Sequence, residues 1–341
     1  MIWSIVATCY NTNTKRLRKG VVDLLLNIGL ATLGFIILIK CADFFVEGSA
    51  SLARNFKIST TVIGLTIVAF GTSAPEIAIS FNAHLTGNTD LLFGNVIGSS
   101  ITNILVILGV AILIRPFKLE LEVIRKQIPI LLLVTLGLSV LFLDTFFNAT
   151  AYNVLNRADA VILLLFFSIF IYYLITILKA DKEKEPVVET PKYKLPKSLF
   201  MILLGLVGII FGSHLIVDHV EAFATSVGIS QKIISVTVIS VGTSLPELVT
   251  IVVAAKKGEN NMAIGNIVGG NIFNICIVLG LPILLLGEAA TTVFTFVDVI
   301  FMIVSVILLW LFSITAREIK RVEAVVFLAI YALYVGYIFM Q

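Results

Sequence analysis

Two stretches of this chain are copies of each other. Residues 63–110 align without a gap on residues 234–281, at a constant offset of 171 positions. Chemically distinctive residues fall on their counterparts: Gly71 on Gly242, Pro75 on Pro246, Glu76 on Glu247, Gly94 on Gly265 and Asn103 on Asn274. Each copy carries one glutamate beside a proline inside a long apolar segment, where a charge costs roughly 2.5–3.5 kcal/mol on the insertion scale. Two such glutamates at matched positions indicate a membrane site that handles cations.

The composition identifies a membrane protein. Of the 341 residues, 59% are hydrophobic and only 13% are charged, whereas a soluble domain has about 25% charged residues. The net charge of +3 does not indicate a nucleic acid partner, because the basic residues lie between apolar segments. The three cysteines are scattered, so we expect small packed side chains and no disulfide or metal cluster. We therefore expect a multi-pass protein of the cell membrane, surrounded by the lipid bilayer, with no protein partner evident.

Ten segments are long and apolar enough to cross a bilayer, which takes about 20 residues. They lie at roughly 21–46, 59–84, 93–114, 128–147, 159–178, 199–219, 232–255, 262–286, 293–312 and 322–340. The chain is thus predicted to comprise an N-terminal tail (1–20), a first five-helix repeat (21–178), a linker (179–198) and a second five-helix repeat (199–341). An odd number of spans per repeat makes the second copy enter from the opposite side. The predicted fold is an all-α polytopic membrane protein of ten transmembrane helices in two inverted five-helix repeats.

Basic residues in the loops set the orientation. With the linker 179–198 in the cytoplasm, the inside loops hold seventeen Lys and Arg residues and the outside loops only Arg157 and Lys232. The basic cluster at 15–19 does not fit this orientation, because ten spans would place it outside the cell. Either that tail is exported despite its charge, or the start of the chain is wrong, or the first span is misread. We follow the loops and predict a cytoplasmic linker, flexible because it is charged and contains proline.

The motif Gly-Thr-Ser-x-Pro-Glu supplies the chemistry of the site. Pro75 and Pro246 each free the carbonyl four residues before them, so the helix is interrupted there. Irregular backbone at membrane depth survives where it lines a cavity or is buried in protein. Carboxylate, hydroxyl, amide and carbonyl oxygens are the hard ligands that calcium and sodium prefer, while transition metals would want His or Cys. A structural Glu76 or Glu247 paired with Lys or Arg is disfavoured, because only Lys40 lies in a span, where we expect its side chain to reach a membrane face.

A second motif, Gly-Asn-x-x-Gly, recurs at 94–98 and 265–269. We expect it to form the helix surface that faces the first motif. Small residues four apart let helices approach closely, so the main role predicted for these glycines is packing. Ser99 and Asn103 lie one turn apart and can point oxygens at an ion. Asn95 and Asn266 are open between a cap at a helix end and a ligand.

The paired motifs resemble the two α-repeats of the sodium/calcium exchanger family, and the short linker is similar to that of prokaryotic members. The resemblance implies a calcium/sodium antiporter with no enzymatic activity and no cofactor, whose partners are calcium and sodium ions. It further implies that Glu76 and Glu247 are shared by calcium and sodium. The remaining ligands that it implies are Thr72, Ser73, Thr243, Ser244, Ser99, Asn103, Asn274 and the carbonyls of Ala69 and Ser240. Prokaryotic relatives often carry Ser at the position of Gly270, and the potassium-dependent branch carries Asp at that of Asn274, so we expect potassium-independent exchange.

Other functions remain to be weighed. A channel would need a continuous pore, whereas two inverted halves suit alternating access. A membrane enzyme could use Glu76 and Glu247 as acid and base, but no nucleophile or cluster of metal ligands accompanies them. Among transporters, proton/calcium exchange is the alternative to electrogenic calcium/sodium exchange. We expect spans one and six to slide against the core that holds the ions.

Overall fold

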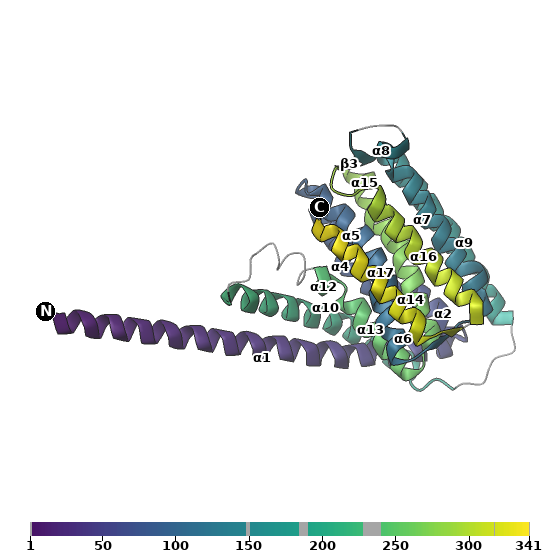
Figure 1. Cartoon of the computed structure of the whole chain (residues 1–341). Coiled ribbons are helices and arrows are strands. Elements are labelled where there is room, and N and C mark those ends of the chain that lie inside the picture. The colour runs from purple at the N-terminus through teal and green to yellow at the C-terminus, as the bar shows by residue number, and fades with distance from the viewer. Residues whose placement is uncertain (1, 148–150, 184–189, 228–239, 317, 341) are drawn as a thin grey trace.

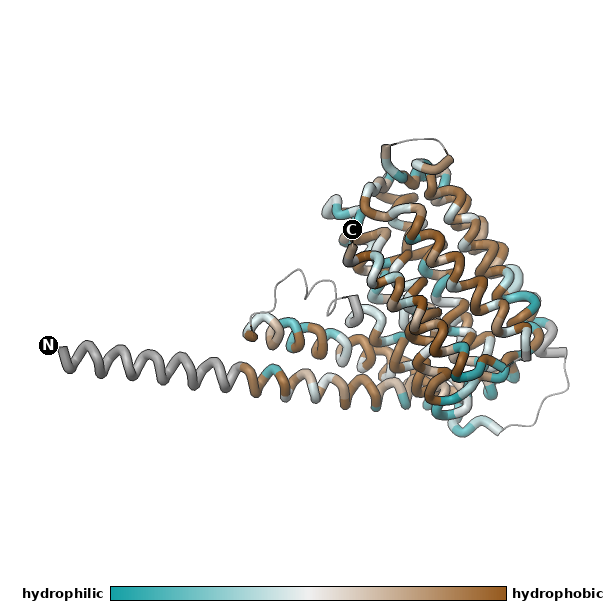
Figure 2. Tube along the Cα trace, viewed as in Figure 1, coloured by the Kyte–Doolittle hydropathy of each residue, from teal (hydrophilic) through white to brown (hydrophobic). Residues whose placement is uncertain are grey.

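The computed structural model describes residues 2–147, 151–183, 190–227, 240–316 and 318–340. Figure 1 shows a bundle of helices with one pair of long helices running out from it, α1 (Ile2–Phe56) and α10 (Leu195–Ser226). The coloured helices of the bundle and of the pair are largely apolar (Figure 2), as expected for helices that face lipid.

Glycines let α1 and α10 approach until their backbones touch. A Cβ atom added at Gly205 would lie 2.7 Å from Phe45 N, and one at Gly212 would lie 2.9 Å from Leu38 N. Such close contact maximises dispersion between helices, which is the main source of helix association in lipid. The two helices therefore form one packed unit.

The first half continues with helices that are broken or locally widened. The elements are α2 (Thr60–Ile63), η1 (Gly64–Val68), α3 (Ala69–Thr72), α4 (Ala74–Leu85), α5 (Thr89–Thr102), η2 (Asn103–Leu108), α6 (Gly109–Ile114), η3 (Val123–Gln127), α7 (Ile128–Phe142), α8 (Asp144–Phe147) and α9 (Arg157–Glu183). The elements labelled η are π-helical turns. Such turns are rare in proteins overall, and where they occur they often lie at functional sites.

The second half repeats this order. Its elements are α12 (Ser240–Thr243), α13 (Leu245–Lys257), α14 (Asn260–Phe273), η5 (Asn274–Leu279), α15 (Gly280–Leu286), α16 (Phe296–Ala316) and α17 (Arg321–Met340). The π-helical segments η2 and η5 begin at Asn103 and Asn274, which are equivalent in the two copies. The repeat seen in the sequence is thus a repeat of local backbone geometry.

Helix α14 lies at the centre of the bundle and is almost entirely covered. A Cβ atom at Gly265 would lie 2.6 Å from Thr61 O, and one at Gly269 would lie 2.6 Å from Leu65 O. These two glycines press α14 against α2 and η1 of the other half, which confirms the packing role predicted for them. The same prediction is wrong for Gly98, because a Cβ atom there would meet no described atom within 4 Å outside its own helix. The halves are also joined by two antiparallel ribbons, β1 (Phe117–Lys118) with β4 (Glu318–Ile319) and β2 (Asn153–Leu155) with β3 (Ala289–Thr291).

The described residues contain eight helices long and apolar enough to span a membrane, or nine if Thr60–Thr72 and Ala74–Leu85 form one bent span. The predicted seventh span, 232–255, falls partly on 228–239, outside the described residues. The predicted first span, 21–46, ends too early, since its helix continues to Phe56, and the predicted fourth span, 128–147, has the wrong bounds, since its helix runs from Val123 to Phe142. The latter helix ends there because Leu143 leaves helical geometry and the Asp144 carboxylate accepts a bond from Val154 N at 3.1 Å.

Candidate functional site

Matched breaks interrupt the helices at the two Gly-Thr-Ser-x-Pro-Glu motifs. The run Thr60–Thr72 ends at Ser73, and α4 departs from it at an angle of 44°. In the second half, α12 and α13 are likewise separated by one residue, Ser244. The prediction of an interruption at both motifs is confirmed.

Each glutamate lies in the first turn of the helix that follows its break. Pro75 and Pro246 also lie in these first turns, where the missing N–H has no helical partner to lose. Glu76 and Glu247 therefore lie at the positive end of α4 and of α13, an arrangement that favours a carboxylate.

The two carboxylates are buried, and the protein leaves them largely unpaired. Glu76 is 1% exposed and Glu247 is 3% exposed. Among the described residues, Glu76 Oε2 and both carboxylate oxygens of Glu247 have no hydrogen-bond partner, and neither glutamate forms an ion pair. A buried charge with no partner is strongly unfavourable. Such a pair is stable only when cations, which include protons, neutralise it.

Polar side chains from the two halves meet around the glutamates. Asn103 Nδ2 donates to Asn271 Oδ1 at 3.0 Å, and Asn274 Nδ2 donates to Ser99 Oγ at 3.2 Å. A third contact joins Thr72 Oγ1 to Asn266 Oδ1 at 3.3 Å. The site is built from both copies of the repeat.

The site contains a surplus of oxygen atoms that receive no hydrogen bond. In the described part of the chain, the buried side-chain oxygens without a partner include Ser73 Oγ, Glu76 Oε2, Ser100 Oγ, Asn103 Oδ1, Glu247 Oε1, Glu247 Oε2, Thr250 Oγ1 and Asn274 Oδ1. Each buried polar atom left without a partner costs about 1–3 kcal/mol. These eight oxygens belong to the two motifs of each repeat or to residues within five positions of them, and such oxygens are the ligands that calcium and sodium prefer. Groups of three or more His, Cys, Asp or Glu suited to a metal are absent from the described residues, so carboxylates alone do not make the site.

The first break holds three of the ligands expected from the sequence. Thr72 and Ser73 are buried, and Ser73 Oγ is without a partner. The carbonyl of Ala69 already accepts bonds from Ser73 N at 3.1 Å and Thr72 Oγ1 at 3.4 Å. In this conformation the Ala69 carbonyl is therefore less available to an ion than a carbonyl that accepts no hydrogen bond. Its ligand role stays a prediction.

The second break holds the matching residues. Ser244 is buried and Thr243 is half-buried. Ser240 begins α12, and its side chain lies outside the described residues. The ligand roles of these three residues also stay predictions.

Asn95 and Asn266 do not cap helix ends. Asn95 lies in the middle of α5, where it donates to Glu76 O at 3.0 Å and to Ser80 Oγ at 2.9 Å. It thereby fixes the backbone of the glutamate against α5. Asn266 lies in the middle of α14. The alternative that these residues are caps is wrong, because both helices begin several residues earlier.

Three polar residues of the site were missed from the sequence, namely Ser100, Thr250 and Asn271. All three are buried. Asn271 accepts from Asn103, Ser100 follows Ser99 in the chain, and Thr250 lies three residues after Glu247. The offset of 171 places Asn271 on Ser100, so a polar residue recurs there inside apolar segments. That recurrence is the signal that could have found two of the three.

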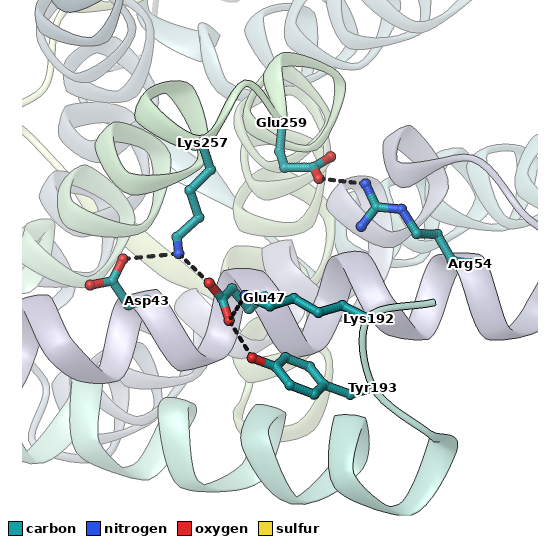
Figure 3. A network of polar contacts seen from close by, with 7 residues as sticks. All are labelled: Asp43, Glu47, Arg54, Lys192, Tyr193, Lys257 and Glu259. Carbon is teal, nitrogen blue, oxygen red and sulfur yellow. Dashed lines mark hydrogen bonds and ion pairs between the residues drawn. The ribbon is translucent and has the colours of Figure 1, made fainter. Parts of the chain in front are cut away.

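A second polar region ties α1 to the loop between α13 and α14 (Figure 3). Lys257 Nζ lies 2.8 Å from Glu47 Oε1 and 3.3 Å from Asp43 Oδ1, and Arg54 Nη2 lies 3.0 Å from Glu259 Oε1. The five residues, with Lys192 and Tyr193 of the linker, form what is termed here the ionic cluster. A cavity of about 260 Å³ lies among them.

The linker takes part in this cluster. Lys192 Nζ lies 3.1 Å from Glu47 Oε2, and Tyr193 donates to the same oxygen at 3.0 Å. The hydrogen bond with Glu47 raises the pKa of Lys192 above its usual value. Asn55 Nδ2 also donates to Tyr193 O at 2.8 Å. The expectation of a flexible linker is therefore wrong for residues 192–193, which are bonded to α1.

Comparisons with known proteins agree with this geometry. The family model described as sodium/calcium exchanger protein matches residues 26–176 and 197–340. A putative antiporter CaxA of Alkalimonas amylolytica is 35% identical over 89% of this chain and 95% of its own length. The sodium/calcium exchanger MaX1 of Methanosarcina acetivorans is 30% identical over 92% of this chain and 98% of its own. A solved structure of the sodium-calcium exchanger NCX_Mj superposes with a TM-score of 0.78 and 32% identity, covering 92% of this chain and 99% of that one.

Proposed function

Because this chain belongs to the sodium/calcium exchanger protein family, we propose that it is an antiporter that exchanges calcium for sodium across the cell membrane. One observation carries the proposal. Two buried carboxylates, one from each repeat, lie without ion-pair partners among the described residues, in a region rich in unpaired oxygens. Cations that enter from either side of the membrane would satisfy those atoms.

The proposed ligands are the residues expected from the sequence. Glu76 and Glu247 would be shared by calcium and sodium, and the others are Thr72, Ser73, Thr243, Ser244, Ser99, Asn103, Asn274 and the carbonyls of Ala69 and Ser240. The site charge of −2 would be neutralised by one calcium or by two sodium ions. A third sodium would make the loaded site positive. Exchange of one calcium for three sodium ions would thus move one net charge, and it would respond to voltage at about 2.3 kcal/mol per charge per 100 mV.

The proposed architecture is ten spans in two inverted five-helix repeats, 21–178 and 199–341, joined by a cytoplasmic linker, 179–198, and preceded by the tail 1–20. The ribbons support it. Shifting β1 by 171 positions brings it onto the start of β3, and the partners of these strands, β4 and β2, come from the opposite halves. Each ribbon thus pairs one half with the other, which is compatible with a two-fold relation between the repeats.

We further propose that α1 and α10 slide together to expose the site on alternate sides. They form one closely packed unit, and charged contacts at one end tie that unit to α13 and α14. Packed helices can shift past one another by small shear motions. Each passage would break and re-form the ionic cluster.

The test is uptake of radioactive calcium into proteoliposomes under an imposed sodium, potassium or proton gradient. The proposal expects uptake driven by sodium alone, faster when the membrane potential favours the net charge movement. Uptake driven by protons and indifferent to sodium would instead establish the alternative, proton/calcium exchange. Single-channel current steps would replace the exchanger by a channel.

A further inference from the structure

An asparagine can help or hinder a cation site, depending on which way its amide faces. The oxygen attracts a cation and the NH₂ group repels it, yet the two ends have nearly the same shape. Asn103 and Asn274 must therefore be held with their oxygens toward the ion. The hydrogen bonds of their NH₂ groups show how this orientation is fixed.

The orientation of Asn103 is fixed through Asn271. The carbonyl of Ser100 can only accept a hydrogen bond, so the side-chain nitrogen of Asn271 must face it, at 3.3 Å. The oxygen of Asn271 then faces Asn103, whose own nitrogen must donate, at 3.0 Å. Asn103 Oδ1 is left pointing away from this chain of bonds, and it has no partner among the described residues.

The orientation of Asn274 is fixed by a shorter chain of bonds. The carbonyl of Val96 accepts the hydroxyl hydrogen of Ser99 at 3.2 Å. Ser99 Oγ must then accept from the nitrogen of Asn274, at 3.2 Å. Asn274 Oδ1 is again the atom left without a partner. For Asn103 the chain ends on a backbone carbonyl, which cannot change its role; for Asn274 the hydroxyl of Ser99, bonded to Val96 O, presents its acceptor side.

The two chains of bonds differ because the repeats differ at one position. The offset of 171 places Gly270 on Ser99, so the second copy has no hydroxyl to hold Asn103 in the way that Ser99 holds Asn274. Asn271, one residue further along α14, supplies the acceptor instead. It is 1% exposed, and both of its amide ends are used in these two bonds.

We propose that Asn271 is a positioning residue that forces Asn103 to present its oxygen to the transported cation. The inference rests on the proposed function, since it assumes a cation beside Asn103. Without Asn271, the amide of Asn103 is free to turn its NH₂ group toward the ion. Because the freed amide then presents its NH₂ group to the ion part of the time, calcium binding weakens on the order of tenfold, which corresponds to about 1.4 kcal/mol.

The test is a double-mutant cycle between Asn271→Ala and Asn103→Asp. A carboxylate has two equivalent oxygens and needs no orientation, so Asn103→Asp should make the site indifferent to residue 271. Calcium affinity is measured on the purified full-length protein by equilibrium binding of radioactive calcium. We expect roughly a tenfold loss from Asn271→Ala alone, and no more than about a twofold loss in the Asn103→Asp background.

Asn153→Ala is the matched control, because Asn153 is a buried asparagine whose amide donates to Phe294 O at 3.0 Å, far along the chain from the motifs. It should leave calcium affinity unchanged. An equal loss from Asn271→Ala in both backgrounds would show a merely structural role and overturn the inference, while wild-type protein that binds no calcium would overturn the proposed function itself. Should Asn271→Ala not fold, Asn271→Ser takes its place in the cycle, because it stays polar yet is too short to reach Asn103.

Discussion

Asn274 and Ser99 lie 175 residues apart in the chain and 3.2 Å apart in the fold. Their bond is the clearest sign that neither repeat makes the site alone. The amide comes from the start of η5, the hydroxyl from the last turn of α5, and each element belongs to a different half. Substitutions in one half should therefore alter the binding of ions by residues of the other half.

Glu76→Gln and Glu247→Gln should each abolish calcium exchange while the protein still folds. Both glutamates are buried and unpaired in the described structure, so a neutral amide of the same shape removes an uncompensated charge. Wild-type protein at a calcium concentration of 100 times Kd gains about 2.7 kcal/mol of stability, and the variants should lose that gain. Thermal unfolding with and without calcium measures it, alongside flux in proteoliposomes.

Glu122→Gln is the control for these two variants. Glu122 is partly exposed and pairs with the exposed Lys126 one helical turn away, at 2.9 Å. Exposed pairs contribute about 0–1 kcal/mol, so flux and calcium stabilisation should persist. Robust flux driven by a gradient in either site variant would show that the carboxylates are not ligands.

Gly270→Ser should be tolerated and should strengthen calcium binding. Among the described residues, the atoms nearest to a Cβ at this position are Ser73 Oγ at 3.8 Å and Asn266 Oδ1 at 4.0 Å, so the added hydroxyl faces the site without a clash. Gly269→Ala is the contrasting change, since its Cβ would lie 2.6 Å from Leu65 O and overpacking costs about 1–3 kcal/mol. The prediction is checked by measuring the calcium affinity and the melting temperature of both variants. A destabilised Gly270→Ser protein would contradict the prediction.

Calcium uptake by the wild type should need no potassium. Asn274 occupies the position where a third carboxylate would otherwise lie, and it donates to Ser99. Asn274→Asp should alter the preference among cations or make uptake fall more steeply as pH is lowered, because a buried carboxylate takes up protons readily. Initial rates in sodium, potassium and choline media at several pH values provide the measurement. An absolute requirement for potassium in the wild type would refute this expectation.

Lys257→Gln should change the turnover of exchange more than the affinity for calcium. The lysine binds Glu47 and Asp43 on α1, and we propose that α1 moves during transport. Partly exposed pairs contribute about 0.2–1 kcal/mol each, so turnover should change about two- to tenfold. Lys126→Gln, which breaks a pair within one helix, should leave turnover unchanged. Identical kinetics of the Lys257 variant and the wild type would mean that transport does not break and re-form the contacts of the ionic cluster.

A cysteine at Lys197 should react with a membrane-impermeant reagent only from the cytoplasmic side. Lys197 is an exposed residue of the linker in the orientation predicted from the basic loops. The native cysteines are replaced first, so that the label reports a single position. Labelling from outside intact cells would invert the topology and make the basic residues 15–19 the better guide.

The repeat was sufficient to predict the family, the helix breaks and the packing of Gly265 and Gly269. It could do so because proline, glycine and a buried charge constrain local structure strongly. The hydrogen bonds of Asn95 and Asn271 were not predictable, since no spacing encodes bonds between helices, although the recurrence of a polar residue at positions 100 and 271 marks Asn271 itself. The linker contacts of Lys192 and Tyr193 were missed for the same reason. Composition predicted a mobile segment, but the fold places Glu47 beside it.

The two strand ribbons have a consequence for how such a molecule can be assembled. Each ribbon joins the halves through backbone hydrogen bonds, at places in the chain far from the linker. The covalent connection is thus one of several connections between the halves, and two separately synthesised halves would still find complementary edges. A gene split within the linker could therefore still yield two halves that assemble.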